Sequence, residues 1–296
     1  MRVFFVKRVF ISILIILSAA VFADEMTGIA GIVEWDTLLI KSTVSLDLAQ
    51  AGIKLPSGRT QGESLLNSGY LTLIQPNIMD LQVDSSSTIA DLIIRGEFGL
   101  LEAENLALKA QSVPPALSSD LRKISVSYTM NLSDVSAALL RHTRPSPVMR
   151  TLIPVSSAQY TGIIVIASDN LPLYGMRSSA LAVPCLFPKI WDSNMNLIYE
   201  RNMLETNNNT MVHYAPLQSI FQDNPSGLAP EIIEVAGNRP LRIFARGLYG
   251  INPTDLIIDK NDAMLIISSN DNRRLLSEGR VVFILNDSVL KKNFTR

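Results

Sequence analysis

The sequence predicts an α+β protein with mixed sheets and packed helices, arranged as one large core or as two small α+β units. Three observations support this fold class. Several short segments alternate apolar and polar residues or are continuously apolar, which is typical of strands. Other segments repeat apolar residues at helical spacing. The 296 residues are 47% hydrophobic, and the two kinds of segment follow one another without an internal repeat.

The N-terminal 23 residues match a secretory signal peptide. Its basic start consists of Arg2, Lys7 and Arg8. An apolar run from Val9 to Ala23 follows and ends on small residues, so we expect cleavage just before Asp24. The run holds 15 residues, fewer than the roughly 20 that a membrane-spanning helix needs, which disfavours an uncleaved anchor. We therefore expect an exported protein of the periplasm or outer membrane.

Charge and cysteine content narrow the classes of partner. Without the three basic residues of the signal, the chain carries 23 Lys+Arg against 27 Asp+Glu, a net charge of −4. No basic stripe is present to neutralise phosphates, so nucleic acid is excluded as the expected partner. Cys185 is the single cysteine, which rules out a disulfide within the chain. We expect it to be a small buried residue; the alternative is a free thiol that pairs with another chain.

Residues 24–147 are expected to form an N-terminal α+β unit, which ends at the Pro-rich link His142–Pro147. The patterns predict, in chain order, a strand within Gly28–Leu48, helices over Gly62–Ile78, Ile89–Ile94 and Phe98–Lys109, a strand over Leu121–Met130 and a helix over Asn131–Arg141. Thr60, followed by Glu63, fits a capping box for the first of these helices. The polar run Asp84–Thr88 is a capping signal for the second.

Residues 148–296 are expected to form a C-terminal, β-rich α+β unit. The patterns predict strands over Thr161–Ala167, Leu181–Val183, Phe187–Trp191, Asn196–Glu200, Arg242–Ala245, Asp255–Ile258 and Val281–Leu285. The turn signal Asp192–Asn196 joins two of these strands in a hairpin. A helix is expected over Asp259–Ile266. The stretches Asn202–Ser226 and Arg274–Glu278 are expected to be loop and polar turn.

Reactive side chains are few, and none lies in a motif of known chemistry. His142 and His213 are the two histidines, and neither has the spacing of a metal ligand. The sequence lacks the HExxH, CxxC, GxSxG, Walker and GxGxxG motifs. Each histidine is therefore expected to be an ordinary loop residue.

Three places hold carboxylates that could act in catalysis, and each has a simpler structural explanation. Asp169 follows a buried strand, but a Pro-containing loop comes next, as in ordinary turns. Glu34 and Asp36 would share one face of a strand, where solvation explains both. Asp259 and Asp262 suit the start of a helix. The sequence therefore assigns no catalytic, cofactor-binding or metal-binding residue.

Several of these segments together resemble the LPP-twenty and FlgP family of bacterial cell-envelope proteins. In the central block the resembling segments are Thr161–Ala167, Phe187–Asp192 and Leu197–Tyr199. In the N-terminal block the helix Gly62–Ile78 and the run Leu81–Asp91 are similar to the family pattern. The closing block, Asn252–Ile258 and Val281–Leu285, looks like the tail of longer, spirochaete-type relatives.

The chain departs from that family in two features. It lacks the lipobox cysteine of the lipoprotein members, so lipid anchoring does not carry over. The hairpin turn reads Asp192-Ser-Asn-Met-Asn where the family has Asp-x-x-Gly. The family has no catalytic residues to transfer, and its members are associated with the surface or the outer membrane, some with flagellar structures. The resemblance therefore implies a structural or assembly role, with flagellar involvement as its more specific form.

Export, the lack of site motifs and the resemblance together favour an exported, non-enzymatic envelope protein that acts in binding or assembly. Its expected partners are other envelope or motility proteins; peripheral membrane association and a homo-oligomer stay open, and no cofactor is expected. One alternative is a secreted hydrolase that uses a carboxylate or a loop histidine. Another is an envelope ligand-binding module with an apolar pocket between the Thr161–Ala167 strand and the helices.

Overall fold

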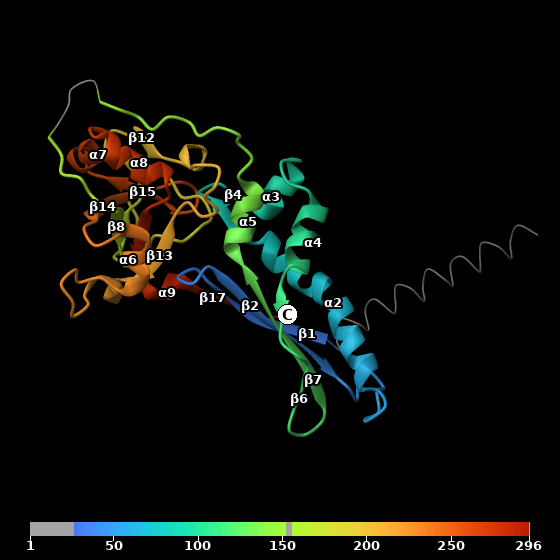
Figure 1. Cartoon of the computed structure of the whole chain (residues 1–296). Coiled ribbons are helices and arrows are strands. Elements are labelled where there is room, and N and C mark those ends of the chain that lie inside the picture. Colours follow the sequence, from blue (N-terminus) through green and yellow to red (C-terminus); the bar gives the residue numbers. More distant parts are fainter. Residues whose placement is uncertain (1–26, 152–155, 296) are drawn as a thin grey trace, which may run out of the picture.

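The chain folds into two large β-sheets with helices packed on them (Figure 1). The structure is a computed structural model that describes residues 27–151 and 156–295. The predicted α+β class is confirmed. None of the helices described there has the length and apolarity that crossing a membrane requires. The predicted signal peptide lies outside the described residues.

The N-terminal sheet comes mainly from the first half of the chain. Its strands are β1 (Thr27–Glu34), β2 (Leu39–Asp47), β5 (Gln111–Ser112), β6 (Ala116–Leu117), β7 (Lys123–Asn131) and, from the far end of the chain, β17 (Lys291–Thr295). They are ordered β17-β1-β2-β7-β5, with β6 also paired to β7. Burial alternates along β2 and β7, because helix α2 (Arg59–Met79) covers one face of the sheet with residues such as Leu66 and Ile74.

Three shorter helices complete the N-terminal unit, by which we mean residues 27–139. They are α3 (Ile89–Ile94), α4 (Leu100–Leu108) and α5 (Leu132–Leu139), and all lie within the predicted ranges. A small hairpin of β3 (Gln82–Asp84) and β4 (Ser87–Thr88) precedes α3.

One predicted helix cap is confirmed and another is wrong. Thr88 caps α3 in a capping box with Asp91. The box predicted at Thr60 does not form, because α2 begins at Arg59 and Thr60 already lies in its first turn. Gly58 takes the cap position without a side-chain bond, and Glu63 pairs with Arg59 at 2.9 Å instead.

The α3 cap gives a testable difference in stability. The Thr88 hydroxyl accepts a hydrogen bond from the Asp91 amide at 3.3 Å, and the Asp91 carboxylate accepts one from the Thr88 amide at 2.8 Å. We expect Thr88→Ala to lower the free energy of unfolding by about 1 kcal/mol, the usual loss for a cap. The matched control is Thr60→Ala, at an exposed helical position, with an expected change within about 0.5 kcal/mol. Urea unfolding of both variants measures the difference. Equal losses in the free energy of unfolding would contradict the assignment of Thr88 as the cap of α3.

The C-terminal unit, residues 163–290, is built around a mixed seven-stranded sheet. Its strands are β8 (Ile163–Ala167), β11 (Ile190–Asp192), β12 (Leu197–Tyr199), β13 (His213–Pro216), β14 (Leu241–Tyr249), β15 (Asp255–Ile258) and β16 (Val281–Leu285). They are ordered β12-β11-β15-β14-β8-β16-β13. Strand β8 runs parallel to both of its neighbours, and every residue of β8 and β16 is buried. Continuously apolar strands of this kind are typical of a sheet covered on both faces.

Helices cover the two faces of this sheet. Helix α6 (Pro230–Ala236) packs on the face that carries Ile164 and Ile284. Helices α7 (Lys260–Ile267) and α8 (Asn270–Ser277) share the core of the opposite face, which carries Val165 and Phe283. The shorter elements are a hairpin of β9 (Leu171–Pro172) and β10 (Ser179–Ala180), the 3₁₀ turns η1 (Arg201–Met203) and η2 (Leu217–Ile220), and α9 (Asp287–Leu290).

Three predicted segments of this unit are wrong. The stretch Asn202–Ser226, predicted as loop, contains β13, which is held as an edge strand by its parallel pairing with β16. Leu181–Val183 is not a strand; it is held by loop packing, in which the Val183 amide bonds to the Pro253 carbonyl. Arg274–Glu278, predicted as a polar turn, forms the end and the C-cap of α8, whose Leu275 and Leu276 pack in the core.

The strand β17 ties the two units together. It pairs antiparallel with β1, from Glu34 opposite Lys291 to Ala30 opposite Thr295. In Figure 1 this red strand lies beside the blue strands of the N-terminal sheet. The two units also share one continuous buried core. Residues 291–295 were expected in the C-terminal unit, whereas the hydrogen bonds of β17 lie in the N-terminal sheet. A division of the chain at residue 147 stays a prediction.

Candidate functional site

The two histidines have different neighbours. The ring Nε2 of His142 bonds to the Leu204 carbonyl oxygen at 2.7 Å. His213 lies in β13, where burial lowers its pKa and the nearby Glu234 acts in the opposite direction. Within the described residues neither ring hydrogen-bonds to a serine, aspartate or glutamate. These contacts therefore do not bring a base, a nucleophile and an orienting acid together in one place.

The carboxylates singled out from the sequence have structural partners or lie exposed. Glu34 pairs with Lys41 at 2.6 Å, and the hydrogen bond from Lys41 is the main cause of its lowered pKa. Asp259 caps α7 through the Asn261 amide, and Asp169 is exposed beyond β8. No group of three metal-ligating side chains occurs among residues 27–151 and 156–295.

Cys185 and Asp262 complete the residues weighed from the sequence. The Cys185 side chain is 1% exposed, and burial raises the pKa of its thiol, so the small buried role predicted for it is confirmed. Burial and the neighbouring Asp259 raise the pKa of Asp262. Neither residue joins a catalytic arrangement among the described side chains.

A row of three aromatic side chains forms the most distinctive surface of the C-terminal unit. Trp191 of β11 meets Tyr249 at the end of β14 edge-on, with ring centroids 5.5 Å apart. Tyr249 meets Tyr174 in the same manner at 6.0 Å. Tyr174 is 55% exposed and Tyr249 38% exposed. We call these three rings, with the exposed neighbours Met176 and Ile251, the aromatic surface.

The backbone positions all three of these residues. Tyr249 lies opposite Asp255 in the β14–β15 pairing, and Trp191 lies opposite Ile257 in the β11–β15 pairing. Both rings are therefore carried by neighbours of β15. The amide of Tyr174 bonds to the Leu248 carbonyl at 2.8 Å, which fixes its loop against β14.

A buried carboxylate beneath the surface fixes Trp191. Asp255 is 0% exposed and accepts from the Trp191 indole N–H at 3.3 Å and from the Ser85 hydroxyl at 3.2 Å through Oδ2. Its Oδ1 accepts from the Thr254 hydroxyl at 3.1 Å and the Lys189 amide at 3.2 Å. Burial raises the pKa of Asp255 although these hydrogen bonds act to lower it. The indole is therefore oriented by a polar group that water does not reach.

Ser85 brings the N-terminal unit into this arrangement. It lies at the turn of the β3–β4 hairpin, and its carbonyl accepts from the Asn252 amide at 2.8 Å. The carbonyls of Gln82 and Val83 accept from the amides of Leu186 and Phe187 at 3.0 and 2.8 Å. The hairpin thus extends into the C-terminal unit and reaches the base of the aromatic surface.

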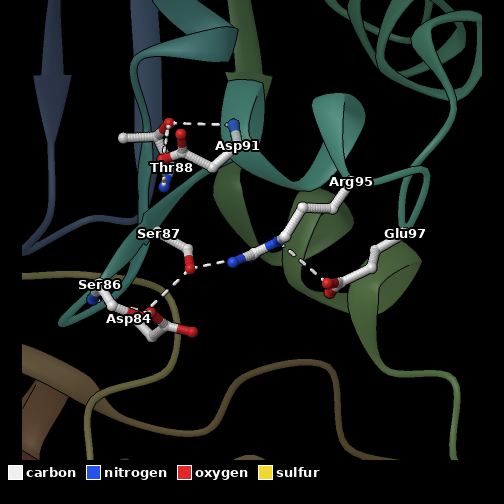
Figure 2. A network of polar contacts seen from close by, with 7 residues as sticks. All are labelled: Asp84, Ser86, Ser87, Thr88, Asp91, Arg95 and Glu97. Atoms are coloured by element: carbon white, nitrogen blue, oxygen red, sulfur yellow. Dashed lines mark hydrogen bonds and ion pairs between the residues drawn. The ribbon is translucent and has the colours of Figure 1, made fainter.

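Polar contacts within the hairpin keep its shape (Figure 2). The Asp84 carboxylate accepts from both the amide and the hydroxyl of Ser86 at 2.9 Å. Arg95 of α3 donates to the Ser87 hydroxyl at 2.9 Å and pairs with Glu97 at 3.0 Å, as Figure 2 shows. Gly250 lies against this turn at φ +112°, and a Cβ there would approach the Ser85 Cβ to 2.3 Å. Glycine is therefore required where the chain passes the hairpin.

A polar depression of about 620 Å³ lies where β8, β13 and β16 end. Ligands of open α/β sheets often bind at such carboxyl ends of strands. Here the lining includes Asp169 and Asp287, which are both exposed, and the mouth is open. The depression does not match the apolar pocket expected between the β8 strand and the helices.

Sequence patterns did not reveal the aromatic surface or the role of Asp255. Trp191 and Asp255 were assigned only to strands, and Tyr174 and Tyr249 were not singled out. One local signal existed, because an aspartate at the first position of a fully apolar strand needs hydrogen-bond partners if that strand is buried. The identity of those partners depends on contacts between distant segments.

Two family models match the chain. The model described as Treponema pallidum Tp0624, N-terminal domain, matches residues 27–138, and the model described as Treponema pallidum Tp0624, second domain, matches residues 162–287. A search of curated proteins finds no match. The resemblance to the LPP-twenty and FlgP family stays a prediction. The two matches, consecutive and covering both units described above, indicate that the chain belongs to a spirochaete-type family.

Proposed function

We propose that this protein is an exported, non-enzymatic component of the cell envelope that binds another envelope or motility protein through the aromatic surface. The observation that supports this most strongly is the contact row of Trp191, Tyr249 and Tyr174. Tyrosine, tryptophan and methionine are enriched at protein interfaces, and the first two dominate binding energy. A single exposed ring is ordinary. Three rings in a row, with Tyr249 in contact with both of the others, lose little further freedom when a partner covers them.

The kind of partner follows from the expected location. The predicted signal peptide supports export, and the match to a spirochaete-type family agrees with a bacterial envelope. The resemblance to the LPP-twenty and FlgP family supports outer-membrane or flagellar structures as the more specific setting. A second copy of the chain is the competing partner.

The alternative of a secreted hydrolase has less support. It would use His142 or His213 as the base, and one ring bonds to a backbone carbonyl while the other lies in a strand. Neither ring contacts the aromatic surface through any described interaction. Binding therefore accounts for more of the observed arrangement than hydrolysis does.

The aromatic surface is tested by crosslinking in producing cells. A benzophenone amino acid at position 174 is expected to give a discrete crosslinked product in the envelope fraction. The matched control is the same label at Phe221, an aromatic residue 72% exposed and outside the surface. Adding Tyr249→Ser is expected to weaken the interaction about 30-fold, the effect of losing one strong interface residue. Phe221→Ser should leave the product unchanged.

Three outcomes would overturn the proposal. Equal crosslinking from positions 174 and 221 would remove the role of the aromatic surface. A product that contains only this chain would make the surface a self-association site. Recovery of the protein in the cytoplasmic fraction would exclude an envelope role.

A further inference from the structure

A cavity of about 180 Å³ lies between the two units and shares no residue with the aromatic surface. Its apolar lining comes from segments far apart in the chain: Val33, Trp35, Leu81, Val183, Val289 and Phe294. Asn77, Asp80, Gln82 and Lys292 add polar groups. A site lined mainly by apolar side chains with a few polar groups is the usual makeup of a small-molecule pocket.

The β1–β17 pairing explains how this cavity forms. Val33 lies opposite Lys292 and Gly31 lies opposite Phe294, so the side chains of each pair share one face of the sheet. Phe294 lies directly over Gly31, where a Cβ would approach its ring to 2.4 Å. Helix α2 covers this face only as far as Met79. The loop with Val183 closes the space from the C-terminal unit.

The volume limits what the cavity can hold. A dry apolar cavity of about 150 Å³ accommodates one benzene molecule. The cavity described here, at about 180 Å³, therefore fits one aromatic ring or one branched aliphatic group. Pockets for larger ligands measure roughly 300–1,000 Å³, which disfavours nucleotides and sugars.

Some polar groups of the cavity have hydrogen-bond partners within the described part of the protein, and others have none. The Asn77 amide donates to the Leu73 carbonyl, and the Gln82 amide donates to backbone carbonyls of its own hairpin. Asp80 and Lys292 are exposed, and among the described residues neither side chain forms an ion pair or hydrogen bond. The cavity therefore presents one free carboxylate and one free ammonium beside an apolar interior.

We infer that the cavity binds a free α-amino acid with an apolar side chain. The side chain fills the apolar interior, the α-carboxylate pairs with Lys292 and the α-ammonium pairs with Asp80. A plain fatty or aromatic acid would leave Asp80 unpaired, and an amine would leave Lys292 unpaired. The ligand would contact both units, because Val183 belongs to the C-terminal unit and Val33 to the N-terminal one. This inference does not depend on the proposed partner of the aromatic surface.

Binding is measured on the purified chain by titration calorimetry and by the shift in unfolding temperature. L-phenylalanine and L-leucine are expected to bind and to raise the unfolding temperature, since a ligand of the folded state stabilises it. L-serine and L-lysine should not. 3-Phenylpropionate and phenethylamine each lack one charge and are expected to bind about two- to fivefold more weakly than phenylalanine, the effect of one exposed ion pair.

Adjacent lysines supply a matched pair of variants. Lys292→Met should weaken binding of phenylalanine about two- to fivefold. Lys291→Met should not, because successive side chains of a strand point to opposite faces and Lys291 lies 3.9 Å from Asp36. Val183→Trp, at a position 37% exposed, should fill the cavity and abolish binding while the protein stays folded by circular dichroism.

Three results would overturn the inference. The first is no binding of phenylalanine or leucine at about 10 mM, well above the range of weak but specific sites. The second is equal binding of 3-phenylpropionate and phenylalanine, which would make the site one for carboxylic acids. The third is an equal effect of Lys291→Met and Lys292→Met, which would place the ligand elsewhere.

Discussion

Replacement of Trp35 by alanine is expected to lower the free energy of unfolding by about 3–5 kcal/mol, the range for a buried aromatic residue. Trp35 is 5% exposed, and its amide bonds to the Leu290 carbonyl of the C-terminal unit at 2.9 Å. Its ring meets Tyr214 edge-on at 5.9 Å, and Tyr214 meets Phe283 in the same way at 6.0 Å. This row of rings runs from the N-terminal unit to β13 and β16, the last two strands at one edge of the other sheet. The variant therefore loses packing within one unit and across both.

Two optical signals make the Trp35→Ala experiment more informative. The sequence holds two tryptophans, so in the variant the fluorescence comes from Trp191 alone and reports the C-terminal unit. Far-ultraviolet circular dichroism reports the whole chain. Because one core spans both units, we expect the two signals to give coincident urea transitions in the unchanged protein. Phe221→Ala, at an exposed site, is the control, with an expected change within about 0.5 kcal/mol. A loss below about 1 kcal/mol for Trp35→Ala would contradict the role given to this ring.

Replacement of Asp255 by alanine is expected to lower the free energy of unfolding by about 2–4 kcal/mol. The carboxylate accepts four hydrogen bonds, from Ser85, Lys189, Trp191 and Thr254. Removing the acceptor leaves buried donors without partners, and each such donor costs about 1–3 kcal/mol, partly relieved by relaxation. Urea unfolding measures the loss. An unchanged midpoint would mean that these donors find other acceptors.

The pH dependence of stability isolates the charge of Asp255. Burial raises its pKa in the folded protein above the ordinary value of 3.8, so the folded state holds its proton more tightly than the unfolded state. Its contribution to stability is fully present below the unfolded pKa and is lost as pH rises through the folded pKa. Asp255→Asn cannot titrate, so its stability relative to the unchanged protein should improve as pH rises from about 3.5 to 7. Ser85→Ala, which removes one hydrogen bond and no titrating group, should keep the original pH dependence. If the free energies of unfolding of Asp255→Asn and the unchanged protein differed by the same amount at every pH, the raised pKa of Asp255 would be contradicted.

The elements that could be predicted are those whose sequence pattern reflects their burial. Strands β8 and β16 are continuously apolar because helices cover both faces of their sheet. Strand β13 was missed because four residues beginning with a histidine carry little pattern, and its place depends on pairing with β16. Helix α8 was missed because Asn272 takes a core position, where its amide donates to the carbonyls of Ala158 and Leu265.

The candidate site could not be predicted from local sequence patterns, for a similar reason. Tyr174, Trp191 and Tyr249 come from three separate segments and meet only when the sheet has formed. One of the hydrogen bonds that Asp255 accepts comes from Ser85, which belongs to the other unit. Spacing within a segment carries no information on such contacts. The absence of catalytic motifs could be seen from the sequence, whereas the aromatic surface could be recognised only from the fold.

The place of β17 has a consequence for the order in which the chain can fold. The edge of β1 stays unpaired until Lys291–Thr295 arrive, which is after nearly all of the intervening chain has been made. Contacts between such distant residues form slowly because a long loop must close first. An open apolar strand edge is meanwhile prone to pair with other chains. If the predicted signal peptide directs export from the N-terminus onward, the chain would depend on protection of this edge until the last strand closes the sheet.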